Sequence, residues 1–506
     1  MTTNKNNDFP SSCSSINGDE PQAGSIHPFW GPATLDAKRD KSRRHQSEHA
    51  WSRQKWIDRN SYFYENLKRL LQFIVEPGKR VLNVRCQTGW FLNALRPEKG
   101  VGIDISLEMI AVARQLYPQF EYVQADSENL DINETFDYIL YNNLEDTVDI
   151  FTPLQRLNKL CERHTRLLIY TYNHWWEPVL KWAERFGMKW PTQEPNWLSE
   201  FDLRNALHLT GFEWLKTYRI ILLPKRIPLI SSFLNRFVAR LPGIDRLCLI
   251  NILVARPSPK PVEPKDVSVS IVVPCKNERG NIKSAVERIP DMGRYTEIIF
   301  CDDKSTNGTT EKVVEFQKAY PGREIKLVHG PGICKADNVW AGFWAATGDV
   351  LMILDGDLTV MPEELPLFFQ VIVENKGEFI NGSRLVYPLP KQAMKFANIL
   401  GNKAFSSAFS FLLGQRIKDT LCGTKVFWRS DWKRMEHLIG TWGGKDLWGD
   451  YELLFAAAKL NLRIVDLPVH YQERVYGITK MANVFWNGLN MLRFYLYGLA
   501  KFKGGY

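Results

Sequence analysis

The sequence has few cysteines, and none of them form a closely spaced pair. Its 8 cysteines are scattered over 506 residues, and no Cys-x-x-Cys spacing occurs. Zinc clusters and small disulfide-stapled domains depend on such spacings, so neither is expected. A reducing compartment suits this pattern, and we predict a cytoplasmic protein.

Long apolar runs are also missing. A membrane-spanning helix needs about 18 or more apolar residues in a row, and no such stretch is present. The segment Met1–Gly24 is polar, rich in Ser and Asn, and lacks the apolar centre of a signal peptide. We expect residues 1–30 to be a disordered tail.

Neither positive nor negative charge strongly predominates. The chain has 65 Lys and Arg against 56 Asp and Glu, which gives a net charge of +9. Its 44% of hydrophobic residues and 24% of charged residues exclude disordered, collagen-like and coiled-coil proteins. The positive surplus favours contact with phosphates, nucleotides or an anionic membrane face. No nucleic-acid partner is expected, because the charge is dispersed and no recognition module is present.

Proline is concentrated at one place in the chain. Four prolines fall between Arg256 and Lys265, a composition typical of a semi-rigid linker. On both sides of it, short apolar runs alternate with amphipathic stretches, which is the α/β pattern. We predict two α/β domains, over residues 31–255 and 267–480, a linker over 256–266 and an amphipathic helix over 481–506.

The first half shows an order of elements that binds nucleosides in doubly wound folds. The pattern predicts a buried strand over Arg80–Val84, a turn at Gly89 and a helix from Trp90. A second strand, Gly100–Asp104, ends in a carboxylate and leads to a helix over Leu107–Leu116. In such folds the first helix points its N-terminus at the ligand, and the acid accepts hydrogen bonds from the ribose.

This segment resembles the class I S-adenosylmethionine-dependent methyltransferases, best over residues 60–175. Val81–Gly89 aligns with the first motif of that family and Gly102–Ser106 with the second. The resemblance implies a Rossmann-like fold and S-adenosylmethionine as cofactor. The residues that it implies for the cofactor are Gly89, Asp104 and Asp126.

The first motif departs from the family at three positions. Arg85 and Gln87 stand where the family has glycines, and Asn83 stands where it usually has an acid. Side chains there crowd the ligand, and Arg85 brings a cation close to a sulfonium. We therefore favour a degenerate domain that acts as a scaffold or binds something else. The alternative is a bifunctional methyltransferase and glycosyltransferase acting on a glycan or small-molecule hydroxyl.

In the second half, three predicted strands over 267–273, 297–300 and 349–354 end in polar residues. Open α/β sheets bind ligands at the carboxyl ends of their strands. Two carboxylates one residue apart suit Mg²⁺ or Mn²⁺, which completes its coordination with phosphate oxygens. The residues that follow these strands are Pro274, Asn277, Glu278, Asp302, Asp303, Asp355 and Asp357.

Taken together, these motifs resemble the family 2 glycosyltransferases of the GT-A fold, from Val267 to about Lys480. The resemblance implies a nucleotide-diphosphate sugar as donor, with Mg²⁺ or Mn²⁺ held by Asp355 and Asp357. The residues that it implies for donor binding are Pro274, Asn277, Glu278, Asp302, Asp303, Lys335, Asp337 and Asp355.

Three further blocks are similar to the dolichol-phosphate mannosyltransferase-like branch of that family. They are Asn381–Arg384, Asp419–Lys425 and Arg474–Lys480. The acceptors of this branch are often polyprenyl phosphates, and its last block supplies cations for phosphate groups. We therefore expect Arg474 and Lys480 among the catalytic residues.

An acidic segment, Gly449–Glu452, corresponds to the acceptor side in that family. A hydroxyl acceptor needs a general base, for which Asp450 is the best candidate, whereas a phosphate acceptor is already an anion that Asp450 would orient. Glu452 shares a face with Asp450 in a strand but lies about 160° away on a helix. Which of the two carboxylates acts is left open.

Two low-charge segments, 395–414 and 482–503, have polar residues three or four apart among Phe, Leu, Ile and Ala. Such helices either lie on an anionic membrane leaflet or pack on their own core. The family resemblance favours a peripheral protein at the inner face of the membrane. We predict an inverting, metal-dependent glycosyltransferase whose acceptor is a polyprenyl phosphate or another lipid or glycan.

Overall fold

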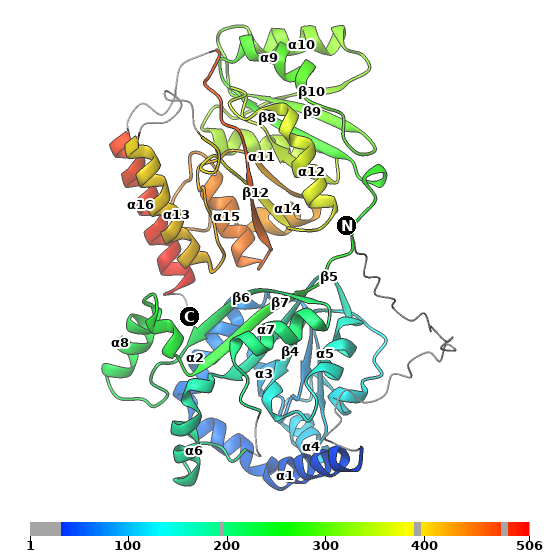
Figure 1. Ribbon diagram of the computed structural model, residues 1–506, viewed down its shortest axis with the longest axis vertical. Coiled ribbons are helices and arrows are strands. Elements are labelled where there is room, and N and C mark those ends of the chain that lie inside the picture. The colour runs from blue at the N-terminus through cyan, green and yellow to red at the C-terminus, as the bar shows by residue number, and fades with distance from the viewer. Residues whose placement is uncertain (1–31, 193–195, 389–395, 477–483, 505–506) are drawn as a thin grey trace, which may run out of the picture.

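A computed structural model describes the chain except for residues 1–31, 193–195, 389–395, 477–483 and 505–506. It contains two seven-stranded sheets, one above the other along the long axis of the molecule, with helices around each (Figure 1). The predicted α/β class with two domains is confirmed. The tail predicted over residues 1–30 lies outside the described residues.

In the N-terminal domain, five parallel strands continue into an antiparallel pair at one edge. In spatial order the strands are β3 (Glu121–Gln124), β2 (Lys99–Asp104), β1 (Arg80–Val84), β4 (Phe136–Asn142), β5 (Cys161–Tyr172), β7 (Ile250–Pro257) and β6 (Phe212–Ile220). The helices are α1 (Pro32–Arg59), α2 (Ser61–Ile74), α3 (Trp90–Leu95), α4 (Leu107–Leu116), α5 (Phe151–Asn158), α6 (Glu177–Arg185), α7 (Glu200–Leu209) and α8 (Ile230–Arg236).

The two faces of this sheet carry separate apolar clusters. Leu140 on β4 packs in a cluster with Leu67 and Leu71 of α2, whereas its neighbour Ile139 packs with Leu154 of α5 and Leu203 of α7. Successive residues of a strand point to opposite faces, so a strand covered on both sides is apolar throughout. The continuous apolar runs in the sequence have this cause.

The C-terminal domain contains a mixed sheet, also of seven strands. In spatial order they are β10 (Glu324–His329), β9 (Thr296–Asp302), β8 (Val269–Cys275), β11 (Val350–Ile353), β13 (Lys425–Trp428), β12 (Phe379–Ser383) and β14 (Ile464–Pro468), with β13 antiparallel to both of its neighbours. The helices are α9 (Arg279–Arg288), α10 (Thr309–Ala319), α11 (Lys335–Ala345), α12 (Leu365–Val373), α13 (Phe396–Leu413), α14 (Arg429–Met435), α15 (Asp450–Lys459) and α16 (Val484–Phe502).

Several elements have the bounds that the sequence predicts. Strand β1 and helix α4 agree at both ends, and β2 ends at the predicted carboxylate, Asp104. The side chain of Ser106 accepts a hydrogen bond from the Met109 N–H and so caps α4. These segments are specified locally, by a polar cap next to an apolar pattern.

The predicted linker begins later than expected. Arg256 and Pro257 are the last residues of β7, and Arg256 is buried, where its Nη2 donates to the carbonyl of Asn375 at 2.9 Å. Farther along, the Val262 N–H donates to the carbonyl of Val373 at the end of α12. The segment is therefore held against the C-terminal domain by hydrogen bonds at two points.

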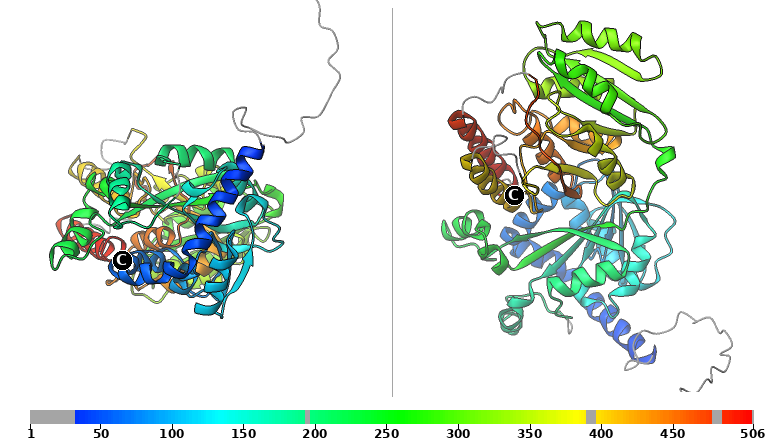
Figure 2. Two further views of the ribbon diagram at one scale, coloured as in Figure 1. Left: turned by 90° about the horizontal axis from the view of Figure 1, so that it is seen from below. Right: turned by 45° about the horizontal axis from the view of Figure 1, so that its top comes forward.

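The two low-charge segments form α13 and α16, which lie side by side at one flank of the C-terminal domain (Figures 1 and 2). Their inner faces pack on the core of that domain, through Phe409 and Leu412 of α13 and Phe494 of α16. Packing on their own core thus accounts for one face of these helices. No helix among the described residues is long and apolar enough to cross a membrane.

Candidate functional site

A cleft of about 380 Å³ opens in the C-terminal domain beside the carboxyl ends of β8 and β11. Strands that run in parallel bring their ends to one edge of the sheet, where loops present polar side chains. The sequence-predicted residues that line the cleft are Pro274, Glu278, Asp303, Lys335, Asp355, Asp357, Asp450 and Arg474.

The two carboxylates that follow β11 each face a cation. Asp355 Oδ1 lies 2.5 Å from Lys335 Nζ, and Asp357 Oδ2 lies 2.5 Å from Arg474 Nη2. The other oxygen of Asp357 accepts hydrogen bonds from the backbone N–H and the hydroxyl of Thr359. Alternating charges therefore surround the centre of the cleft.

The pairing of Lys335 with Asp355 shifts the pKa of both groups. Burial alone lowers the pKa of Lys335, but the carboxylates of Asp355, Asp450 and Asp357 outweigh it and raise that pKa. Burial alone likewise raises the pKa of Asp355, but Lys335 and other cations lower it below the ordinary value. Lys335 is thus held charged and Asp355 ionised.

The backbone at Gly423 approaches the Asp355 carboxylate closely. A Cβ atom at this position would lie 2.2 Å from Asp355 Oδ2, well inside contact distance. Only glycine leaves room for the carboxylate in its present position. The block Asp419–Lys425 contributes to the site through this missing side chain as well as through its charges.

Arg384 is a cleft residue that the sequence alone does not assign to the site, although it belongs to the block Asn381–Arg384. Its side chain lines the cleft and forms a two-pronged ion pair with Asp419, with Nε–Oδ2 2.7 Å and Nη2–Oδ1 2.9 Å. Burial alone would lower the pKa of Arg384, but Asp419 raises it, so the guanidinium stays charged. The sequence does contain one signal for this pair, because one block ends in the cation Arg384 and the next begins with the acid Asp419.

Asp450 and Glu452 have different surroundings, because the segment is the start of helix α15. Asp450 lines the cleft, and its Oδ1 lies 3.0 Å from Nζ of the buried Lys425. Glu452 is not among the residues that line the cleft, and its Oε1 accepts from the Gly440 N–H. Burial next to Asp446 raises the pKa of Glu452 to about 7. The helix therefore separates the two carboxylates, as the 3.6-residue period requires.

Other candidates lie beside the cleft without lining it. Asn277 Oδ1 accepts from the Thr306 N–H at 2.8 Å, and Asp302 Oδ2 accepts from the Ser305 N–H at 3.1 Å. These two side chains hold the loop after β9. Asp337 on α11 is instead paired with Lys445 at 2.6 Å. The last candidate, Lys480, lies outside the described residues.

The donor set in the cleft fits a divalent cation that shares its coordination with phosphates. The described residues contain no group of three or more His, Cys, Asp or Glu side chains that could hold a metal alone. Mg²⁺ usually needs only one or two carboxylates and takes its other ligands from water and substrate phosphates. Asp355 and Asp357 supply that number from one loop.

The N-terminal domain keeps the backbone of a nucleotide-binding loop after β1. Arg85, Gln87 and Gly89 have φ angles of 55°, 52° and 78°, in the left-handed region that favours glycine. Two side chains therefore occupy positions with glycine geometry, at a cost of about 1 kcal/mol or more each. The backbone of the loop thus keeps its shape, but the side chains of Arg85 and Gln87 occupy positions where glycines would leave space for a ligand.

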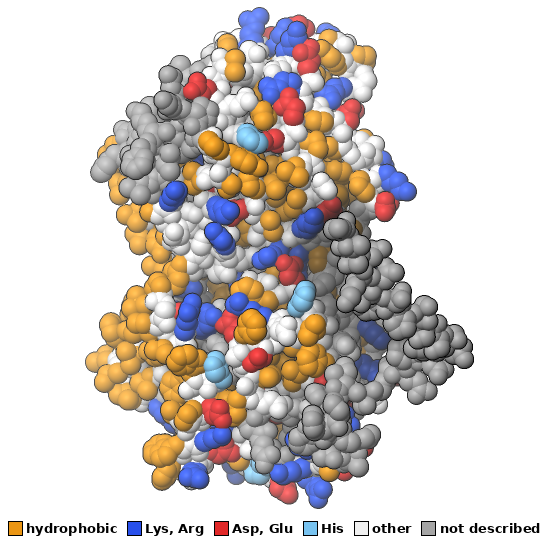
Figure 3. Space-filling model, in the orientation of Figure 1, with side chains coloured by type: hydrophobic (Ala, Val, Ile, Leu, Met, Phe, Trp, Pro, Cys, Tyr) orange, Lys and Arg blue, Asp and Glu red, His pale blue; other side chains and the backbone are white. Residues whose placement is uncertain are grey.

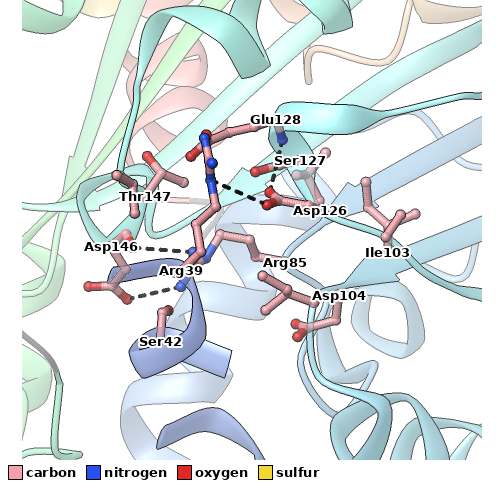
Figure 4. A pocket seen from close by; sticks show the side chains of 14 residues that line it. Arg39, Ser42, Arg85, Ile103, Asp104, Asp126, Ser127, Glu128, Asp146 and Thr147 are labelled. Carbon is pink, nitrogen blue, oxygen red and sulfur yellow. Dashed lines mark hydrogen bonds and ion pairs between the residues drawn. The ribbon is translucent and has the colours of Figure 1, made fainter. Parts of the chain in front are cut away.

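Side chains fill the pocket predicted for S-adenosylmethionine (Figure 4). Arg39 reaches in from α1 and donates from Nε to Glu128 Oε2 at 3.0 Å, and Arg85 donates to the carbonyl of Asp146. The remaining cavity measures about 20 Å³, room for about one water molecule. Pockets for small molecules usually measure about 300 Å³ or more.

Asp104, the residue predicted to bind the ribose, is already hydrogen-bonded to other groups of the protein. Asp104 is buried, and its carboxylate accepts from the Gln87 N–H at 2.9 Å and the Ser106 N–H at 3.0 Å. The Gln46 amide, with its nitrogen toward Asp104, adds a bond of 2.8 Å to the same carboxylate. Asp126 accepts from the Glu128 N–H and lies 3.8 Å from the Arg39 guanidinium. In this arrangement the pocket does not fit S-adenosylmethionine.

Comparison with known proteins matches each half to a family. Residues 270–434 match the family described as "Glycosyl transferase family 2", and residues 55–217 match "Methyltransferase domain". A dolichol-phosphate mannosyltransferase of Pyrococcus furiosus is 35% identical over 122 residues, which are 24% of this chain and 34% of that protein. The enzyme of the same name from Saccharomyces cerevisiae is 34% identical over 110 residues, which are 21% of this chain and 40% of that protein.

The chain thus spans well under half the length of these two relatives. Among solved structures, a SAM-dependent methyltransferase of Thermotoga maritima matches with 16% identity and a TM-score of 0.34, over 42% of this chain and 97% of that one. The two family matches lie one after the other and do not overlap. The chain therefore carries a methyltransferase domain followed by a family 2 glycosyltransferase domain.

Proposed function

We propose that the C-terminal domain transfers a sugar from a nucleotide-diphosphate sugar to a polyprenyl phosphate, with inversion at the anomeric carbon. The observation that carries this proposal is the cleft in which Asp355 and Asp357 each face a cation. The match to family 2 glycosyltransferases and the similarity to two dolichol-phosphate mannosyltransferases support it.

The charge pattern of the cleft suits two phosphate-bearing substrates. Its lining includes Lys276, Lys335, Arg384 and Arg474, which approach from four different segments. A diphosphate donor and a phosphate acceptor bring several negative charges together, and cations are needed to hold them in contact. A neutral hydroxyl acceptor would need fewer of them.

In the proposed reaction, a phosphate oxygen of the acceptor attacks the anomeric carbon from the face opposite the leaving diphosphate. The new C–O bond forms as the bond to the diphosphate breaks, which inverts the configuration. A phosphate acceptor is already ionised, so no proton has to be removed. Asp450, held at 3.0 Å by Lys425, then orients the acceptor side of the cleft.

Asp355 and Asp357 would hold Mg²⁺ or Mn²⁺ against the donor diphosphate. Such a cation neutralises the charge that develops on the leaving group. Lys335 and Arg474 pair with these carboxylates in the present structure, and both lie within reach of phosphates bound there. Metal dependence is thus part of the proposal, with Asp355 as its most direct probe.

For the N-terminal domain we propose a role that does not use S-adenosylmethionine. The filled pocket beside Arg39 and Arg85 supports this reading over the bifunctional alternative. The domain packs against the glycosyltransferase domain through buried polar contacts, such as Lys216 Nζ donating to the carbonyl of Ala458 at 2.7 Å. Its contribution is then structural or concerned with binding.

The test is a transfer assay with labelled nucleotide sugars, Mg²⁺ or Mn²⁺, and a polyprenyl phosphate in detergent micelles. The label should move to the organic phase with the parent protein and fall by at least about a hundredfold with Asp355→Asn or with EDTA. Asp291→Asn is the matched control, because Asp291 is an exposed carboxylate paired with Arg323 at 3.3 Å and is not part of the cleft lining.

The outcomes separate the alternatives. Label that stays in the aqueous phase on a glycan or small molecule would overturn the lipid-phosphate acceptor and favour a hydroxyl, with Asp450 as its base. Equal loss in Asp291→Asn and Asp355→Asn would overturn the assignment of the cleft. Sugar transfer that survives both EDTA and Asp355→Asn would overturn the proposed metal dependence.

A further inference from the structure

The segment around α8 places apolar side chains where they contact solvent. Leu229 is 88% exposed, and Phe233 and Phe237 are 59% and 58% exposed. Isolated exposed apolar residues are common, but a run of them within one short segment marks an interaction surface. The large apolar residues of this segment that are exposed include Leu229, Ile230, Phe233, Phe237, Leu241 and Leu247.

Two polar residues of α8, Ser231 and Asn235, point the other way, into the protein. Ser231 is buried and accepts from the Ile227 N–H at 2.7 Å. Asn235 is also buried, and its Oδ1 accepts from the backbone N–H groups of Leu222 and Leu223. A surface helix ordinarily buries its apolar face. On α8 the buried side chains are the polar Ser231 and Asn235, whereas Ile230 and Phe233 are exposed together with Ser232 and Arg236, so apolar surface beside a cation is left outside the chain.

Helix α16 of the other domain shows a second apolar stripe. Trp486, Leu489, Leu492 and Leu496 are exposed, while Met491 and Phe494 on its inner face are buried. Helices α8 and α16 lie at the same flank of the molecule in all three ribbon views (Figures 1 and 2). Apolar side chains gather on that flank in the space-filling view (Figure 3).

The segment that follows α8 lies next to the C-terminal end of α16. The residues after α8 and the ends of α13 and α16 line one common hollow, which includes Arg240, Leu413 and Lys503. The domains are held together by buried contacts, so the stripes keep a fixed relation. We call the exposed apolar residues of 225–247 and of α16 the apolar flank.

Basic residues accompany the apolar flank. Segment 225–247 carries Lys225, Arg226, Arg236, Arg240 and Arg246 against a single acid, Asp245. That acid is itself paired with Arg219 at 3.2 Å. Apolar and aromatic side chains beside Lys and Arg are the composition that binds the headgroup region of an anionic bilayer.

We propose that the apolar flank is a lipid-binding face and that the N-terminal domain, through its α8 segment, docks the chain on anionic membranes. The inference rests on the proposed function in one respect, since a polyprenyl-phosphate acceptor lies in a bilayer. It assigns the methyltransferase domain a membrane-docking role, which does not require a cofactor in its filled pocket. It also extends the contact beyond the C-terminal helices to which the sequence pattern pointed.

The test is co-sedimentation of the full-length protein with vesicles, without any nucleotide sugar. One set of vesicles is phosphatidylcholine alone, and the other contains phosphatidylglycerol as well. We expect binding to the anionic vesicles that falls at least about tenfold in the double variant Phe233→Ser, Phe237→Ser. The double variant Arg226→Glu, Arg236→Glu should lose the preference for anionic vesicles by about tenfold or more.

Phe201→Ser is the matched control, because Phe201 is an exposed phenylalanine on α7 outside the apolar flank. Unchanged vesicle binding in this variant and unchanged melting temperatures in all variants would tie the loss to the flank. Equal binding of the Phe233→Ser, Phe237→Ser variant and the parent would overturn the proposal. So would a parent that ignores vesicles and instead dimerises through the flank in size-exclusion chromatography.

The micelle assay keeps this proposal separate from the proposed function. Sugar transfer in detergent micelles does not need docking on a bilayer, so the Phe233→Ser, Phe237→Ser variant should work there like the parent. The same variant should be slowed about tenfold when the acceptor is in anionic vesicles. A parent that binds vesicles but transfers no sugar would overturn the proposed function and leave the lipid-binding face in place.

Discussion

Nη2 of Arg166 in the N-terminal domain lies 2.8 Å from both carboxylate oxygens of Glu378 in the C-terminal domain, and both side chains are fully buried. Arg256 Nη1 approaches the same carboxylate at 3.5 Å. Charges buried in this way are stable only when they are paired. The pair therefore ties the two domains together and makes their relative orientation costly to change.

Removing the carboxylate should destabilise the protein strongly. Glu378→Gln leaves the buried Arg166 without its counter-charge, while Arg256 keeps its pair with Glu213, and we expect a loss of about 3–5 kcal/mol in the free energy of unfolding. Chemical denaturation measures it. Glu363→Gln is the control, because Glu363 pairs with Arg288 at 2.7 Å on the surface, where a pair contributes less than about 1 kcal/mol. Equal losses in the two variants would contradict the role of the buried pair.

The same pair predicts a dependence on pH. Burial alone would raise the pKa of Glu378, but Arg166 and Arg256 outweigh it and hold the pKa at about 2, below the ordinary 4.5. A lowered carboxyl pKa stabilises the fold above the unfolded pKa, and this stabilisation is lost as the pH falls toward the folded value. The difference in unfolding free energy between parent and Glu378→Gln should stay constant above about pH 5 and shrink below about pH 4.5. A difference that grows on acidification would contradict the pairing.

Gly423→Ala should disturb the site without disturbing the fold. The new Cβ would lie 2.2 Å from Asp355 Oδ2, so the carboxylate has to move. A displacement of about 1 Å in a catalytic group can cost about a hundredfold in rate, and we expect a fall of that order in sugar transfer. Gly322→Ala is the matched control, since nothing lies within 4 Å of a Cβ added there. Full activity in Gly423→Ala would show that Asp355 does not act from its present position.

The helix start at Asp450 predicts unequal effects of two nearby carboxylates. Asp450→Asn should slow transfer to a polyprenyl phosphate by about tenfold without abolishing it, because an ionised acceptor needs no base. Glu452→Gln should leave the rate unchanged, since Glu452 does not line the cleft. Initial rates at saturating donor measure both. Complete loss in Asp450→Asn, with an unchanged melting temperature, would point to a hydroxyl acceptor instead.

Calorimetry tests whether the filled pocket of the N-terminal domain binds S-adenosylmethionine. The parent should give no heat of binding with S-adenosylmethionine, because Arg39 and Arg85 leave a cavity of about 20 Å³. Asp104→Ala should behave in the same way, since its carboxylate is engaged by Gln87 and Ser106. Saturable heat from the parent that Asp104→Ala removes would contradict this account and restore the bifunctional alternative.

Local chemistry in the sequence is enough for much of the fold. The apolar run ending at Asp104, and the cap at Ser106 before an apolar helical pattern, specify β2 and α4 through neighbours in the chain. The ends of β8 and β11 are equally readable, because polar residues follow apolar runs and parallel strands bring those ends together. For this reason Pro274, Glu278, Asp355 and Asp357 were predicted together and line one cleft.

Contacts between distant segments were decided only by the tertiary structure. The partners Arg384 and Asp419 stand 35 positions apart in the sequence, and Arg166 and Glu378 stand 212 apart, so no local pattern joins them. The pocket beside Asp104 is filled by Arg39 from a helix whose charge pattern resembles any solvated face.

The sequence by itself determined the two α/β domains and the acidic loop of the cleft, because periodicity and strand ends are properties of neighbouring residues. The tertiary structure decided which carboxylate of α15 faces the cleft, which pocket is closed and which face of α8 is left outside. Those three outcomes depend on how separate elements pack, and packing is set by complementary surfaces that are far apart along the chain.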